Sequence, residues 1–160
     1  MGEATAGKDT KVVAMTASSG SGTGGVLNKS DIYGASSSDE VAGCNNLSAP
    51  NGYNALDSTD FGDVAENVIL GMKSGNWTLE GNYNDLSPTA LETLEDAFDQ
   101  GNAVEVGFIV DETVGTSSDA KGYEMTVFVT DFNLDSEQSG KVEFSITVQC
   151  SDGDGWNRLQ

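Results

Sequence analysis

The sequence predicts a mainly β protein, in which an antiparallel β-sandwich or barrel-like sheet packs against one α-helix. Residues Val142 to Cys150 alternate between apolar and polar types without a break, as in a strand with one buried face. Stretches 103–110 and 123–130 show the same alternation, and polar, glycine-containing loops join them. Only the stretch 88–100 has the apolar spacing of a clear helix. A sheet and one helix can bury their apolar faces against each other, which gives a single compact domain.

The helix is predicted over residues 88–100. Ser87 is a good N-cap, Pro88 suits the first helical position, and Gly101 ends the helix. Before it, "SGNWTLEGNY" alternates as a strand, preceded by the strand-like "VAENVILGM". The core predicted from these faces consists of Trp77, Leu79, Leu91, Leu94, Phe98, Val106, Phe108, Val127, Phe144, Ile146 and Val148.

The chain divides by composition into three parts. Residues 1–60 are rich in Gly, Ser and Asn, which predicts an N-terminal arm with loops that becomes ordered on assembly. Residues 61–153 hold the periodic segments and form the domain proper, and residues 154–160 form a C-terminal tail. No apolar run is long enough to span a membrane, and the first residues lack a signal-peptide pattern, so we expect the protein to fold inside a cell.

The net charge of −19, from 26 acidic and 7 basic residues, excludes binding nucleic acid by neutralising phosphates. Solubility or a saline habitat explains the same acidity equally well. The chain has no histidine, no nucleotide-binding glycine motif and no nucleophile elbow, and two cysteines are too few for a zinc site or a disulfide scaffold. We therefore expect no enzyme activity and no cofactor.

Three passages carry a resemblance to a known family. "LDSTDFGDVAENVILGMKSGNWTLEGNYND" contains a Phe-Gly turn, a Gly-Met-Lys step and an alternating strand; "ALETLEDAF" runs into "VEVGFIV"; and "VFVTDFNLDSEQSGKVEFSITVQCSDG" forms a closing hairpin. Over about residues 57–153, this order resembles the major tail tube protein of long-tailed, non-contractile bacteriophages and related archaeal viruses.

The resemblance implies a structural virion protein with the tail tube fold. Six subunits would form a ring, and rings would stack head to tail into a hollow tube in the virion tail, assembled in the host cytoplasm. The implied partners are other copies of the chain, the tape-measure protein, and the tail terminator and baseplate proteins. DNA would cross the lumen without specific binding, and no membrane is involved.

On this resemblance, one face of the sheet lines the lumen. The candidates are the polar residues of the alternating strands, namely Glu105, Glu124, Thr126, Glu143, Ser145, Thr147 and Gln149. Ile109 and Phe128 fall on the same nominal faces, which indicates contact with a neighbouring subunit or with the helix.

Two other classes of function remain open from the residues alone. One is a different virion or surface β-sandwich module, such as a capsid decoration or adhesion protein. The other is a carboxylate enzyme or calcium-dependent binder, for which the acidic residues show no ligand or catalytic spacing.

The composition of the first 60 residues predicts uneven protection in the unassembled protein. Amide hydrogen exchange should be fast across residues 17–60 and slow in 104–110 and 142–150, because the latter carry the regular apolar pattern. Mass spectrometry of peptides from the monomer measures this directly. Uniform protection along the monomer would contradict the division of the chain.

Overall fold

The structure is a computed structural model of the 160-residue chain. It describes residues 10–22, 25–35, 39–41, 44–57, 62, 68–83, 89–138, 140–151 and 155–159.

One curled antiparallel sheet dominates the fold. Its eight strands follow the order β1-β5-β6-β7-β4-β2, with β3 paired to β4 and β8 paired to β6. The strands are Lys11–Thr16 (β1), Cys44–Ser48 (β2), Asn51–Asp57 (β3), Val68–Asn82 (β4), Ala103–Ile109 (β5), Gly122–Ser136 (β6), Val142–Cys150 (β7) and Asn157–Arg158 (β8). The helices are Lys29–Tyr33 (α1) and Thr89–Gln100 (α2), with a 3₁₀ turn at Glu112–Val114 (η3). The mainly β, antiparallel prediction is confirmed; α1 is an additional helix.

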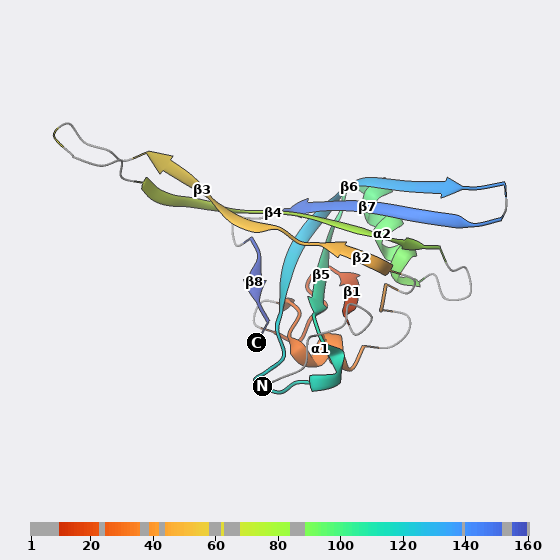
Figure 1. The fold of residues 1–160 in the computed structure, drawn as a ribbon, viewed down its shortest axis with the longest axis horizontal. Helices are drawn as coiled ribbons and strands as arrows, with labels where there is room; N and C mark the ends of the chain where they lie inside the picture. Colours follow the sequence, from red (N-terminus) through yellow and green to blue (C-terminus); the bar gives the residue numbers. More distant parts are fainter. Residues whose placement is uncertain are drawn as a thin grey trace.

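The strand β6 belongs to both halves of the sheet. Its first half pairs with β5, whereas its second half forms a long hairpin with β7. A register shift lies between Val129 and Asp131, at the point where the strand passes from one half to the other. Such a bulge bends a strand and increases its twist. Figure 1 shows β6 turning out of the lower part of the molecule into this hairpin, so the sheet is curled.

The interior of the curl is the main core. Trp77 of β4 is fully buried and meets Phe108 of β5 edge to face, with ring centroids 5.4 Å apart. Because β4 and β5 are separated by two strands in the sheet, this contact crosses the curl. Helix α2 covers the same interior through Leu91 and Leu94, which are buried.

Phe98 is the one predicted core residue that the structure does not bury. The other ten are buried as predicted, but Phe98 is 40% exposed. Its ring stacks on the ring of Phe132 in the β6–β7 hairpin, at the rim of the core, with ring centroids 6.4 Å apart. The helical spacing placed Phe98 on the correct face, but Phe98 lies near the end of α2, where it meets only the rim of the core.

A second, smaller core lies on the opposite face of β1, β5 and β6. It consists of Val13, Leu27, Ile32, Ile109 and Leu159. Gly107 allows this packing, since a Cβ there would lie 2.9 Å from Ile32 Cδ1 and 3.0 Å from Leu27 Cδ1. Residues 25–35 thus cover a sheet face that was predicted from the sequence to be exposed to water.

Helix α1 is fastened at both ends. Asn28 caps its N-terminus, and Asp31 accepts hydrogen bonds from the backbone of Asn28 and of Ser21. Burial acts to raise the pKa of Asp31, but these hydrogen bonds outweigh it and lower the pKa. At the other end, Lys11 Nζ donates to the carbonyls of Tyr33 and Ala35, which ties α1 to β1.

The predicted boundaries differ from the structure at both ends of the chain. The region expected to be an arm supplies β1, β2, β3 and α1, so in the structure it is part of the sheet. Whether it orders only on assembly stays a prediction. The predicted helix start at Ser87 and Pro88 and the predicted turn residue Phe61 lie outside the described residues. Gly101, with φ of +71°, follows the last residue of α2 as predicted.

The C-terminal segment, expected to be a tail, fastens the β3–β4 hairpin to the body. Trp156 packs edge to face on Tyr53 of β3 and Tyr123 of β6, and its Nε1 donates to the Gly52 carbonyl. Lys73 Nζ of β4 lies over the Trp156 ring and donates a hydrogen bond to the backbone carbonyl of Trp156. Beyond this point β3 and β4 project away from the body as an arm (Figure 1).

Burial of Leu94 gives a direct test of the helix packing. Leu94→Ala should lower the free energy of unfolding by about 2–5 kcal/mol, because the site is fully buried between α2 and the sheet. Urea denaturation of the unassembled protein measures the loss. A change below about 0.5 kcal/mol would contradict this packing.

Candidate functional site: a polar sheet face

Strands β6, β7, β4 and β2 present one continuous polar face on the side of the sheet opposite the main core. Directly paired residues of antiparallel strands point to the same side, so their polar residues form rows across the sheet. One row runs from Asp131 through Thr147 and Thr78 to Ser48. The polar face consists of Asn46, Ser48, Asn76, Thr78, Glu80, Asn82, Asp131, Asn133, Asp135, Glu143, Ser145, Thr147 and Gln149.

The polar face is open to solvent in the single subunit. All its residues are exposed or half-buried, whereas Trp77, Leu79, Ile146 and Val148, which alternate with them, are fully buried. The strand period of two therefore separates a wet face from the core along β4 and β7.

The charge of this face is negative. It carries the carboxylates of Glu80, Asp131, Asp135 and Glu143, and its remaining members are amides and hydroxyls. Lys141, just before β7, pairs with Glu143 at 2.8 Å, which raises the pKa of Lys141 through the hydrogen bond and the charge of Glu143. Asn46 Nδ2 donates to Glu80 Oε2 at 3.3 Å, which links the edge strand β2 to β4. The face offers hydrogen-bonding groups with few positive charges nearby.

Four of the residues predicted to face a lumen lie together on this face. They are Glu143, Ser145, Thr147 and Gln149, all on β7. The flanking residues on β4, β2 and the second half of β6 were not among the predicted ones. For β4 the signal was present, because Asn76, Thr78 and Glu80 alternate with Trp77 and Leu79. For β6 the bulge hides it, since one extra residue reverses the alternation after Val129.

The prediction that Glu105 and Glu124 face a lumen is wrong, because both side chains are buried. Thr126 lies beside Glu105 rather than on the polar face. Both glutamates are only 2% exposed and lie on the part of the sheet beneath the second core. Thr126 is half-buried, and its Oγ1 donates to Glu105 Oε1 at 2.7 Å. Polarity alone suggested a wet face, but Gly107 and Ile109 on the same face of β5 already indicated a covered one.

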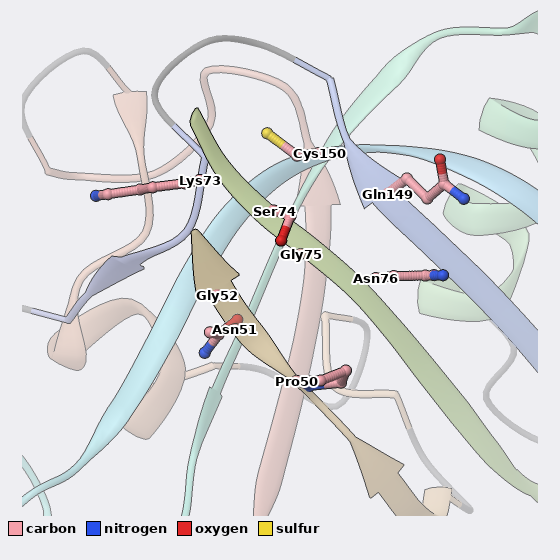
Figure 2. A pocket seen from close by; sticks show the side chains of 9 residues that line it. All are labelled: Pro50, Asn51, Gly52, Lys73, Ser74, Gly75, Asn76, Gln149 and Cys150. Carbon is pink, nitrogen blue, oxygen red and sulfur yellow. The ribbon is translucent and has the colours of Figure 1, made fainter. Parts of the chain in front are cut away.

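A cavity of about 490 Å³ lies where the polar face meets the base of the β3–β4 arm. Figure 2 shows Asn76 and Gln149 pointing to the same side at its rim, with Asn51 and Gly52 of β3 below. The indole N–H of Trp77 donates a hydrogen bond to Asn51 Oδ1, at 2.9 Å.

Among the described residues, no group of His, Cys, Asp and Glu is arranged to hold a metal ion. No helix in the described ranges is long and apolar enough to cross a membrane.

Comparison with solved structures identifies the class of fold. The chain is similar to the SPP1 tail tube, with a TM-score of 0.68 and 13% identity over 98% of this chain and 79% of the other. It is also similar to a chain in the tail of an empty gene transfer agent particle of C6 symmetry, and to one in the native gene transfer agent virion. Each of these has a TM-score of 0.66 and 14% identity over 98% of this chain and 100% of the other.

The chain therefore has the tail tube fold, as the sequence resemblance implied. The likeness lies in the fold rather than in the sequence, since no family model and no curated protein sequence matches the chain.

The different surroundings of two glutamates can be tested by charge reversal. Glu124→Lys should destabilise the subunit by at least about 3 kcal/mol or prevent folding, because it places an ammonium group at a buried position. Glu143→Lys should change stability by less than about 1 kcal/mol, because its side chain is 45% exposed. Thermal and urea unfolding of both variants measures the difference. Equal effects would contradict the assignment of the two residues to different environments.

Proposed function

We propose that the chain is a tail tube subunit, which assembles into stacked hexameric rings that form the hollow tail tube of a virus. The observation that carries this proposal is the polar face, because four adjacent strands combine an acidic, hydrogen-bonding surface with a largely apolar reverse side. A wall between an aqueous channel and a protein core needs this arrangement. The solved tail structures of the same fold, one of them with C6 symmetry, support it.

The free edges of the sheet suit ring closure. The β1 edge is already covered, since Ala14 N–H donates to Asp39 and Val41 N–H donates to Val12. On the outer side of β6 past Phe128, and on the outer side of β2, the described residues provide no paired strand. Four antiparallel strands in the order β6-β7-β4-β2 make β6 and β2 run in opposite directions. The β6 edge of one subunit can therefore pair antiparallel with the β2 edge of the next, which leaves no free edge in a closed ring.

The β3–β4 arm gives a second reason to expect assembly. It projects from the body beyond the contacts of Trp156 (Figure 1). A two-stranded hairpin is marginally stable in water when nothing packs on it. In a tube, neighbouring rings would supply the surface that the arm lacks.

The acidic lumen explains how DNA would pass without binding. Carboxylates on the polar face repel phosphates, and amides and hydroxyls keep the wall hydrated.

The role is structural, with no catalytic step. We further propose the tape-measure protein, the tail terminator and the baseplate as partners, and the virion tail as the location. Negative-stain electron microscopy of the purified protein tests the assembly: stacked rings with a bore are expected, whereas uniform particles without a bore would favour a decoration or adhesion module.

Charge reversal in the lumen should slow genome delivery. The double variant Glu80→Lys and Glu143→Lys raises the net charge by four per subunit, and six-fold repetition multiplies this change around each ring. Glu124, also predicted to face the lumen, is not suitable for this test because it is buried. Tubes should still form, while genome ejection should stall at low salt, because phosphates would pair with the ammonium groups along the bore. The defect should ease above roughly 0.1 M salt, where the Debye length falls below about 10 Å.

The matched control reverses two exposed acids away from the polar face, Glu92→Lys on α2 and Asp119→Lys in a loop. It adds the same charge and should leave ejection unchanged. Normal ejection from intact tubes of the Glu80 and Glu143 variant would show that the polar face does not line the DNA path.

A further inference from the structure

We propose that neighbouring subunits of the ring are joined by an apolar seam, in which a patch on one copy fits a groove on the next. The patch consists of Phe98, Phe132 and Leu134, and the groove lies between β1 and β2. The inference rests on the proposed ring and adds the side chains that hold it together. It makes the interface head to tail, since patch and groove are different surfaces of the same chain.

The patch lies where α2 meets the β6–β7 hairpin. Phe98 is 40% exposed and stacks on the half-buried Phe132, and Leu134 further along β6 is 48% exposed. Leu134 pairs with the buried Phe144, and Phe132 pairs with the buried Ile146, so both point to the core side of the sheet rather than to the polar face. The main core thus extends to the β6 edge and stops there with apolar side chains in water. Contiguous exposed apolar groups of this kind mark interaction surfaces.

The groove opens at the other end of the sheet. It is a cavity of about 330 Å³ between β1, β2 and the end of β5, and none of its lining residues is charged. Leu47, Phe108 and Val110 contribute its apolar walls, and Val110 is 38% exposed. Burial raises the pKa of the Cys44 thiol, which keeps this lining residue neutral. An uncharged, largely apolar hollow favours an apolar occupant.

Strand register brings the two surfaces to the same level of the sheet. Phe132 pairs with Ile146, Ile146 with Leu79, and Leu79 with Leu47, so Phe132 and Leu47 end the same row at opposite edges. When β6 of one copy lies beside β2 of the next, Phe132 of the first copy and Leu47 of the second become neighbours on the core side. Phe98 and Leu134 are then placed against the groove, and the apolar cores of adjacent subunits become continuous.

A second copy is the occupant that these features select. Within the described residues, no strand pairs with either edge. The two edges run in opposite directions and end the same row, and each carries its apolar surface on the same side of the sheet. A partner of another sequence would have to match both the strand edge and the level of the row, whereas another copy of the chain matches them already.

Two single substitutions test the seam, one on each surface. Leu134→Glu blocks the patch, and Val110→Glu blocks the groove; both sites are substantially exposed, so both variants should fold. Each variant should fail to form rings under conditions in which the wild type forms them, because a carboxylate would be buried in an apolar contact. The control is Phe128→Glu. Phe128 pairs with Gln149 of the polar face and so lies on the side of β6 away from the patch. It is 42% exposed, so the seam requires no contact there, contrary to the subunit contact that its apolar side chain suggested, and the change should leave rings intact.

A mixture of the two blocked variants gives the sharper result. The intact patch of the Val110→Glu chain can still enter the intact groove of the Leu134→Glu chain, but each resulting pair then has only blocked surfaces left. Sedimentation should therefore show a 1:1 heterodimer in the mixture, and monomers for each variant alone. Circular dichroism of each variant confirms that it is folded.

The outcomes separate the seam from the proposed function. Rings of Leu134→Glu or Val110→Glu as abundant as those of the wild type would overturn the seam and leave the tail tube function standing. A mixture of folded variants that remains monomeric would overturn the head-to-tail pairing of these two surfaces. A wild type that forms no rings or tubes at all would instead count against the tail tube function itself.

Discussion

The contact between Trp77 and Phe108 closes the curl of the sheet, and the rest of the subunit depends on it. The two rings meet edge to face across the apolar interior, although their strands are separated by β6 and β7. The same indole donates a hydrogen bond to Asn51, which starts the β3–β4 arm. One side chain thereby fixes the curvature of the sheet and the departure point of the arm. A flat sheet would expose the apolar face that α2 and the curl together bury.

The curl gives the two faces of the sheet different uses. On the inner face, a single core joins both halves of the sheet to α2. On the outer face, residues 25–35 and the C-terminal segment cover the half that contains β1 and β5, whereas the half that contains β7 and β4 remains open. Glu105 and Glu143 occupy equivalent outward positions on alternating strands, yet one is buried and the other faces water. The open half is the surface that the proposed tail tube function needs.

At two edges of the sheet, apolar side chains next to the core are exposed to solvent. Phe98 looked like an ordinary core residue in the sequence, and its exposure follows from the position of α2 at the rim beside Phe132. Leu134 and Val110 are exposed for the same reason, since the sheet ends next to them. In the proposed ring, the neighbouring copy would supply the missing part of the core.

The sequence by itself determined the strands with regular alternation, the helix over Leu91 and Leu94, and nearly all of the core, because periodicity reports directly which side chains share a face. It also indicated the tail tube fold from the order of its elements. Only the tertiary structure decided which polar faces remain wet. Glu105 and Glu124 are buried on the face of β5 and β6 where the second core lies. Leu27 and Ile32 of that core come from a segment that is distant in sequence and carries no periodic signal of its own. The bulge after Val129 likewise reverses the alternation of β6, so Asp131, Asn133 and Asp135 join the polar face only once the strand pairing is known.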